Sequence, residues 1–248
     1  MRTQANILAA GRGRRLEPLT RTIPKCLVPV QGKALLVRTL EHLEDRGIRN
    51  AVLVVGHLRE QVYRTIGHRF GRTQISYVEN ELYSRTNNVY SLWLARDRLD
   101  ADSLLIECDL HFDVRLIDAL LHPRRDCNVL VSPYDPTTME GTVVEIDRDH
   151  TIRGLTVKAR QGRGFSHGRL YKTVNMYFWS RAFLQHYLLP YLDLYVRVHG
   201  RRSYYELVLG LLAYLGEPRC HAVIVAANRW CEIDDEVDLR RAERCAFA

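Results

Sequence analysis

Small and basic residues gather behind the first apolar segment of the chain. Residues 6–9 lead into a Gly- and Arg-rich run at 10–15, and a Pro-Lys motif follows at 24–30. Because glycines lack a Cβ, backbone N–H groups can approach a polyphosphate there, and the basic side chains supply compensating charge. This spacing predicts a site for a nucleoside triphosphate. Its expected members are Leu8, Ala9, Ala10, Gly11, Arg12 and Gly13 as nucleotide contacts, with Arg15 and Lys25 as catalytic cations.

The two motifs are more specific together than the glycines are alone. A dinucleotide-binding Gly-x-Gly-x-x-Gly would need a third glycine where Leu16 stands, and a P-loop would need Gly-Lys-Ser/Thr. The chain has Leu-Ala-Ala-Gly-Arg-Gly-Arg-Arg-Leu at residues 8–16 and Pro-Lys-Cys-Leu-Val-Pro-Val at residues 24–30. These runs resemble the signature of the sugar-phosphate nucleotidyltransferase superfamily at every fixed position. The resemblance implies transfer of a nucleotidyl group with release of pyrophosphate.

Two aspartates are candidates for a magnesium site, because Mg²⁺ prefers hard oxygen ligands beside phosphates. Asp109 follows the apolar residues 104–106, at the expected ligand edge of a sheet, although taken alone it fits a turn cap better. Glu232 and Asp234 would share one face of an extended segment, whereas the carboxylates after them suit the first turn of a helix. Residues 230–235 resemble the Trp-x-Glu-Ile-Asp-Asp motif of cytidylyltransferases, which implies that Asp234 is a metal ligand.

Amide side chains in the first half of the chain indicate a segment that binds the nucleotide. Residues 86–92, Thr-Asn-Asn-Val-Tyr-Ser-Leu, resemble a stretch of bacterial phosphocholine cytidylyltransferases. The resemblance implies that Asn88 and Ser91 lie near the nucleotide. Asparagine is also an ordinary helix N-cap, and both uses are expected here.

A lysine, an asparagine and several tyrosines in the second half of the chain indicate the binding site for the acceptor. Residues 171–177, Tyr-Lys-Thr-Val-Asn-Met-Tyr, with Ser-Tyr-Tyr-Glu at 203–206, resemble phosphonate cytidylyltransferases more closely. The resemblance implies that Lys172 meets the phosphonate and the α-phosphate as a catalytic cation, and that Asn175 and Tyr205 line the acceptor site with it. The alternative is a strand whose alternate apolar residues form one buried face while Lys172 points outward.

Two further patterns leave the acceptor open. Arg160, Arg163 and Arg169 fit either a strongly anionic acceptor or a solvated loop. A quaternary ammonium such as that of phosphocholine calls for an aromatic cage. The candidate cage residues are Tyr171, Tyr177, Tyr204 and Tyr205.

Strand-like and helix-like segments alternate through the first half of the chain. The pattern predicts strands over residues 6–9, 51–55, 74–79, 104–107 and 129–132, and helices over 34–46, 58–68, 88–98 and 114–121. Such alternation forms a mostly parallel sheet with helices on both faces and ligands at the carboxyl ends of the strands. The second half predicts a hairpin over 142–157, a loop over 158–168, strands over 173–179 and 221–226, and helices over 181–198, 203–215 and from 235.

We therefore expect a Rossmann-like α/β fold in a single domain over residues 1–248. Its nucleotide-binding half covers about residues 1–135, and a β-hairpin and helical insertion for the acceptor lies within about residues 136–248. Pro190 is expected to kink or split the helix that contains it.

Composition limits the class of protein. The 248 residues are 46% hydrophobic and 26% charged, as in soluble globular enzymes, and no segment reaches the roughly 20 apolar residues of a membrane span. We expect a cytoplasmic protein without a membrane partner. The six cysteines lack metal-site spacing and are expected as reduced thiols. The formal net charge of +7 suits anionic partners, but the charges are spread along the chain, which favours small phosphorylated substrates over nucleic acid.

The resemblance as a whole implies a Mg²⁺-dependent CTP:phosphonate cytidylyltransferase. The expected partners are CTP and a small phosphonate or phosphate acceptor, and a homo-oligomer stays open. Phosphocholine is the alternative acceptor, followed by a hexose 1-phosphate with another nucleotide. Outside this class, a non-catalytic nucleotide-binding protein stays open, although such a protein need not keep both Asp109 and Asp234.

Overall fold

The computed structural model describes residues 3–122, 125–162, 165–166, 168–216, 219–245 and 247. At its centre lie four parallel strands in the order β7 (Ser103–Glu107), β1 (Gln4–Ala9), β4 (Asn50–Val55) and β6 (Thr73–Glu79). β7, β1 and β4 are buried on both faces along nearly their whole length, which is the pattern of a parallel sheet covered on both sides, whereas β6 is partly exposed. The predicted α/β fold with a mostly parallel central sheet is confirmed.

Beyond β7 the same sheet continues with mixed strand directions. β12 (Tyr171–Trp179) runs antiparallel to β7 and to β9 (Cys127–Pro133), and β13 (His221–Ile224) runs parallel to β9. The expected hairpin consists of β10 (Val143–Ile146) and β11 (Ile152–Thr156), and β10 pairs with β12. No crossover helix connects β9 to β12 within the described residues, and a parallel pair would need one.

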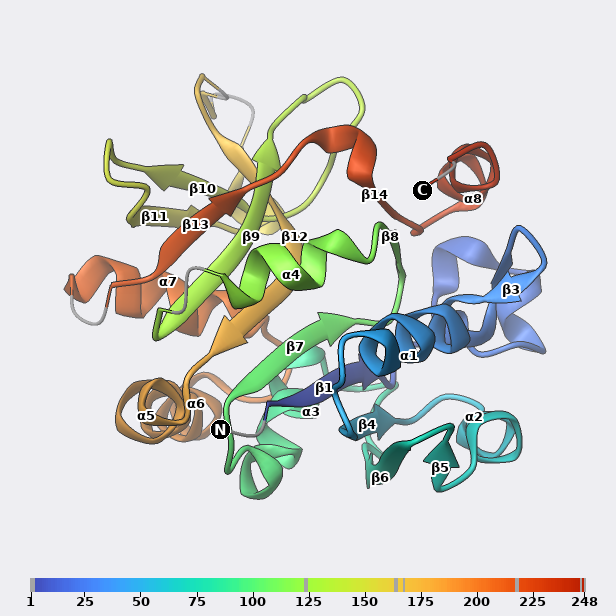
Figure 1. Cartoon of the computed structure of the whole chain (residues 1–248). Coiled ribbons are helices and arrows are strands. Elements are labelled where there is room, and N and C mark those ends of the chain that lie inside the picture. Colours follow the sequence, from blue (N-terminus) through green and yellow to red (C-terminus); the bar gives the residue numbers. More distant parts are fainter. Residues whose placement is uncertain are drawn as a thin grey trace.

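Helices cover both faces of the sheet (Figure 1). One apolar core joins Ile7 and Ala9 of β1 to α1 (Leu35–Asp45), α2 (Arg59–Ile66) and α4 (Arg115–Leu121). The other joins Leu8 to α3 (Asn88–Leu94), α6 (Leu189–His199) and α7 (Glu206–Leu215). Adjacent residues of β1 therefore point into opposite cores, as the pleat of a strand requires.

Helix ends differ from the sequence pattern by a few residues. The helix expected over 88–98 ends at Leu94, and a 3₁₀ turn, Arg96–Arg98, follows. The helix expected over 181–198 consists of α5 (Arg181–Phe183), a π-helical segment (Leu184–Leu188) and α6, so its character changes directly before Pro190. Proline fits there because the first turn of a helix needs no N–H donor.

The remaining elements are short. They are β2 (Pro29–Val30) paired with β3 (Lys33–Ala34), β5 (Arg69–Phe70) paired with β6, α8 (Glu236–Ala242), and 3₁₀ turns that include Arg14–Leu16 and Lys25–Leu27. Among the described helices, none has the length and apolar character that crossing a membrane requires.

A separate two-stranded sheet brings the C-terminal segment to the end of β7. β8 (Leu110–Phe112) pairs antiparallel with β14 (Trp230–Glu232), and the two lie beside each other in Figure 1. The backbone N–H of Ile233 donates to the carbonyl of Asp109 at 2.9 Å. This pairing places the acidic residues after β14 next to Asp109.

Candidate active site

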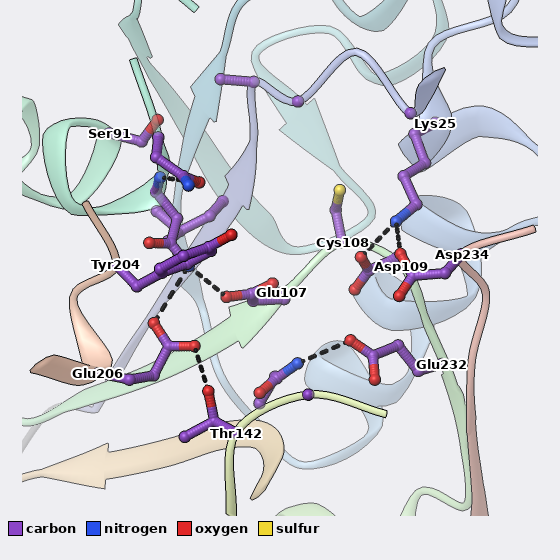
Figure 2. Close-up of a pocket in the computed structure, with 18 of the residues that line it drawn as sticks. Lys25, Ser91, Glu107, Cys108, Asp109, Thr142, Tyr204, Glu206, Glu232 and Asp234 are labelled. Atoms are coloured by element: carbon purple, nitrogen blue, oxygen red, sulfur yellow. Dashed lines mark hydrogen bonds and ion pairs between the residues drawn. The ribbon is translucent and has the colours of Figure 1, made fainter. Parts of the chain in front are cut away.

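A cavity of about 400 Å³ lies at the carboxyl ends of β1 and β7 (Figure 2). Its walls come from the loop after β1, the start of α3, the segment before β10 together with β12, and the end of β14. In parallel α/β folds this edge of the sheet is where ligands bind. The predicted site residues that line the cavity are Leu8, Ala10, Gly11, Gly13, Arg15, Lys25, Asn88, Ser91, Asp109, Lys172, Asn175 and Asp234.

Three carboxylates form a cluster in this cavity. One ligand oxygen from each of Asp109, Glu232 and Asp234 lies within 4.8 Å of the others. Asp109 Oδ1 is buried and accepts no hydrogen bond from the described residues. A buried carboxylate oxygen without a donor is costly, and a cation removes that cost. Because all the donors are carboxylate oxygens, the cluster fits a hard divalent cation such as Mg²⁺.

Lys25 binds two of these carboxylates. Its Nζ lies 2.6 Å from Asp109 Oδ2 and 2.8 Å from Asp234 Oδ1, and its side chain is 11% exposed. Burial disfavours the ammonium, but the two carboxylates outweigh burial and raise the pKa of Lys25 above its ordinary value. Burial alone would raise the pKa of Asp234. The positive charges of Lys25 and then Arg15 outweigh burial, so the pKa of Asp234 is lowered. Arg15 Nη2 lies 2.8 Å from Asp234 Oδ1, so two cations meet this carboxylate.

The two glycines of the first motif have different roles. Gly13 has φ 63°, and a Cβ there would lie 3.1 Å from the side chains of Lys25 and Thr20. Thr20 Oγ1 donates to the Gly13 carbonyl at 2.8 Å, which holds the turn in place. A Cβ at Gly11 would meet nothing within 4 Å, so the surface of the cavity is open there. Gly13 therefore shapes the turn, and Gly11 leaves room beside it.

Lys172 is buried against Glu232. Its Nζ lies 3.0 Å from Glu232 Oε2 and donates to the Thr173 carbonyl at 2.9 Å, and its side chain is 2% exposed. The alternative in which Lys172 points outward is wrong, because β12 is covered on both faces. Asn175 has φ 58° at an irregularity between β12 and β9, and its Nδ2 donates to Glu232 Oε1 at 3.0 Å. Glu232 thus connects Lys172 and Asn175 to the carboxylate cluster.

The two amides at the start of α3 both line the cavity, and one of them also caps the helix. The cap is Asn87, whose side chain accepts from the Asn88 backbone N–H. The Asn88 side chain donates to Glu107 and Glu206, and Ser91 Oγ accepts from Asn80 Nδ2 at 3.0 Å in the same wall.

Three predicted contacts are not in the cavity wall. Ala9 faces the core that contains α1, because it alternates with Leu8 and Ala10 along the chain. Arg12 pairs with Glu17 at 3.6 Å instead. Tyr205 is fully buried, and its hydroxyl donates to Glu107 at 3.0 Å.

The neighbours of Tyr205 line the cavity in its place, namely Tyr204 and Glu206. The other members of the expected tyrosine cage, Tyr171 and Tyr177, are not in the wall either. Of the basic loop residues, Arg160 and Arg169 do not line the cavity, and Arg163 lies outside the described residues.

Two further glutamates line the cavity and were not among the predicted site residues, although Glu206 ends the Ser-Tyr-Tyr-Glu run at 203–206. Glu107 ends β7 and Glu206 begins α7, and Asn88 Nδ2 donates to both, at 3.1 and 3.2 Å. Burial, and then the charges of nearby carboxylates, raise the pKa of Glu107 well above its ordinary value. Burial also raises the pKa of Glu206. The spacing Glu107-x-Asp109, like Glu232-x-Asp234, is the one signal that could have found Glu107.

The sequence model of the MobA-like NTP transferase domain matches residues 5–187. The chain belongs to this family. The match contains the glycine turn, Lys25, Asp109 and Lys172, while β14 and Asp234 lie beyond it.

Known proteins resemble this MobA-like chain along its length. The CMP-5'-(3-aminopropyl)phosphonate synthase of Streptomyces rubellomurinus is 37% identical over 242 residues, which is 97% of this chain and 38% of the relative. The choline-phosphate cytidylyltransferase of Streptococcus pneumoniae is 40% identical over 166 residues, 64% of this chain and 66% of the relative. The chain thus spans less than two thirds of either relative.

A solved structure shows the same fold. The CTP:phosphocholine cytidylyltransferase of Streptococcus pneumoniae superposes with a TM-score of 0.78 at 24% identity, covering 98% of both chains. At this identity the likeness shows the fold of the MobA-like domain.

Proposed function

We propose that this MobA-like domain transfers CMP from CTP to a small phosphonate and releases pyrophosphate. The observation that carries the proposal is the arrangement of two buried lysines in one cavity. Lys25 lies on the Asp109 and Asp234 side of the carboxylate cluster, and Lys172 lies on the Glu232 side. A nucleotidyl transfer needs cationic groups on both sides of the reacting α-phosphate, because negative charge develops there as the acceptor attacks.

The residues of the cavity divide the work of this reaction. The turn at Gly11 and Gly13 receives the triphosphate, with Arg15 and Lys25 beside it. Asn88 and Ser91 lie on the side of the cavity expected for the nucleoside. Lys172 holds the acceptor, whose phosphonate oxygen attacks the α-phosphorus of CTP. The bond from that phosphorus to the oxygen of the leaving pyrophosphate breaks. For such a displacement the protein needs only to position the two substrates and neutralise their charge.

Mg²⁺ fits the carboxylate cluster and would be held by Asp109 and Asp234, with Glu232 as a third oxygen donor. When bound there, it would neutralise phosphate oxygens of the nucleotide. Lys25 binds both aspartates and holds them close together, and its charge lowers the pKa of Asp234, which prepares the pair as ligands.

A phosphonate is proposed over phosphocholine for two reasons. The relative that matches nearly the whole chain is named for a CMP-activated aminopropylphosphonate. In addition, Tyr204 is the single member of the expected four-tyrosine cage that lines the cavity among the described residues, and Tyr83, the other tyrosine of the wall, packs beside His57. A quaternary ammonium is best bound by several aromatic faces.

The test is pyrophosphate release with Mg²⁺ and each of the four nucleoside triphosphates, combined with 2-aminoethylphosphonate, 3-aminopropylphosphonate, phosphocholine and glucose 1-phosphate. We expect release with CTP and a phosphonate. Faster turnover with phosphocholine than with a phosphonate would show that phosphocholine, the alternative acceptor, is the substrate. Turnover limited to glucose 1-phosphate, or none with any pair, would reject the proposal.

A further inference from the structure

Two cysteine thiols meet outside the wall of the cavity. Cys231 lies in β14, and Cys245 follows α8, which packs beside β14 (Figure 1). Their Sγ atoms lie 3.1 Å apart and share a hydrogen bond, although the two residues are 14 positions apart in sequence. The sulfurs of a disulfide are about 2.05 Å apart, so a movement of about 1 Å would bring these two to bonding distance.

The two thiols belong to a small apolar core, which is separate from the two cores that flank the main sheet. Its buried members are Leu16, Val30, Leu35, Cys231, Ile233 and Ala242, and Leu239, Cys245 and Phe247 pack against them. Ile233 is fully buried in this core, whereas its neighbours Glu232 and Asp234 line the cavity. Because adjacent residues of an extended segment point to opposite sides, the small core lies directly behind the carboxylate cluster.

A few contacts hold the segment after α8 in this place. Gln31, in the turn between β2 and β3, donates from Nε2 to the Cys245 carbonyl at 2.6 Å and from its backbone N–H to Glu243 Oε2 at 2.9 Å. The rings of His111 and Phe247 lie 4.6 Å apart between centroids. These contacts keep Cys245 beside Cys231 without a covalent bond.

Cys245 is the thiol that an oxidant can reach. All six cysteines are free, and five of them are buried, whereas Cys245 is partly exposed. Cys127 also forms a hydrogen bond with a second cysteine, Cys220, but both of these thiols are buried. Thiol oxidation requires access to the sulfur. The pair of Cys231 and Cys245 therefore combines a reachable thiol with a second thiol in contact with it.

We propose that Cys231 and Cys245 form a reversible disulfide, with a small disulfide such as oxidised glutathione as the oxidant. The Cys245 thiolate attacks one sulfur of the oxidant, and the other half leaves as a thiolate that takes up the Cys245 proton. The Cys231 sulfur then attacks Cys245 Sγ, and the second glutathione leaves with the Cys231 proton. Two protein thiols are thus oxidised to one disulfide, and the oxidant is reduced to two thiols. The bond locks the segment after α8 onto the small core.

The first experiment looks for this bond. The reduced native chain is equilibrated with several ratios of oxidised to reduced glutathione, its free thiols are alkylated, and its tryptic peptides are weighed. Cleavage after arginine should release residues 230–240 joined to residues 245–248, and dithiothreitol should separate them. Glutathione that stays on Cys245 without forming the link would overturn the proposal. Alkylation of both cysteines at every ratio would overturn it as well.

Matched variants assign the bond to this pair within one chain. Cys245→Ser should leave Cys231 free for alkylation once unfolded, at every glutathione ratio. Cys220→Ala removes one thiol of the buried pair and should keep the native link. Cys231 joined to any other cysteine, or a link between two chains on a non-reducing gel, would contradict the proposal.

The second experiment measures what the bond does to the fold. A disulfide that closes a loop of about 15 residues restricts the unfolded chain, so the oxidised native chain should have a Tm roughly 5–10 °C above that of the reduced chain. The same treatment should leave the Tm of Cys245→Ser unchanged, which separates this bond from oxidation elsewhere. An unchanged or lowered Tm of the oxidised native chain would show that the bond does not lock the segment.

Discussion

Lys25 Nζ lies 2.6 Å from Asp109 Oδ2, although 84 residues separate the two in sequence. The contact joins the glycine-rich turn after β1 to the end of β7, and Asp234 completes it from the C-terminal segment. Three distant parts of the chain therefore meet at one ammonium. A buried charge that pairs with two carboxylates holds the walls of the cavity together.

Replacing Asp109 tests the proposed metal site. Asp109→Asn keeps the size of the side chain but removes the charge, so turnover should fall roughly 1,000-fold while the fold persists. Pyrophosphate release and thermal unfolding measure the two effects separately. Asp149→Asn, at an exposed position of the hairpin turn, is the control and should match the native chain. Unchanged turnover in Asp109→Asn would remove Asp109 from the metal site.

Replacing Lys172 separates the acceptor from the nucleotide. Lys172→Met should lower kcat/KM for the phosphonate roughly 100-fold, because a charge-assisted contact to the acceptor is lost. The KM for CTP should change much less. Lys33→Met removes a lysine that pairs with Glu41 at the surface and should behave like the native chain. An effect confined to CTP affinity would contradict the acceptor role of Lys172.

The two glycines of the first motif should respond differently to alanine. Gly13→Ala should destabilise the fold by roughly 1–2 kcal/mol, because an L-residue is strained at φ 63° and its Cβ would crowd Lys25. Gly11→Ala should leave stability nearly unchanged and weaken CTP binding, because its Cβ would occupy open space in the cavity wall. Urea unfolding and CTP titration measure both. Equal loss of stability in the two variants would contradict this division.

Asp113 should make stability depend on pH. Burial opposes its ionisation, but hydrogen bonds from Arg115 and Arg229 outweigh burial and hold the pKa of Asp113 well below its ordinary value. A lowered carboxylate pKa stabilises the fold above the unfolded value of about 4 and loses this contribution as pH falls through the folded value. Asp113→Asn should therefore cost roughly 1–3 kcal/mol at pH 7.

The same variant supplies the check. The difference in the free energy of unfolding between Asp113→Asn and the native chain should shrink as the pH is lowered from 4 toward 2. Urea unfolding across this range measures it. A difference that stays constant would mean that the ionised carboxylate of Asp113 contributes nothing, and that the loss has another cause.

The glycine turn and the parallel centre of the sheet could be predicted from sequence because their causes are local. Apolar runs such as residues 104–106 and small residues at the strand end determine both features within a few positions. The direction of β12 has no such signal. It depends on where the hairpin leads the chain back to the sheet, and therefore on pairing with β7, which is distant in sequence.

Near α7 the sequence indicated the segment that lines the cavity, but not which of its residues do so. Tyr204, Tyr205 and Glu206 are adjacent, and which of them reach the cavity depends on where α7 begins. Asn175 reaches it through a left-handed backbone that alternation along a strand does not predict. Glu206 ends the Ser-Tyr-Tyr-Glu run but was not predicted as a site residue, because a glutamate before an apolar helix is ordinary as a first-turn charge.

The most direct test of cytidylyl transfer is a ³¹P NMR spectrum of the chain incubated with CTP, Mg²⁺ and 3-aminopropylphosphonate. We expect a new pair of mutually coupled signals, one from the phosphonate phosphorus and one from the α-phosphate, which grows with pyrophosphate and is absent in Asp109→Asn. Consumption of CTP without a coupled phosphonate signal, or no reaction where another nucleotide and acceptor do react, would contradict it.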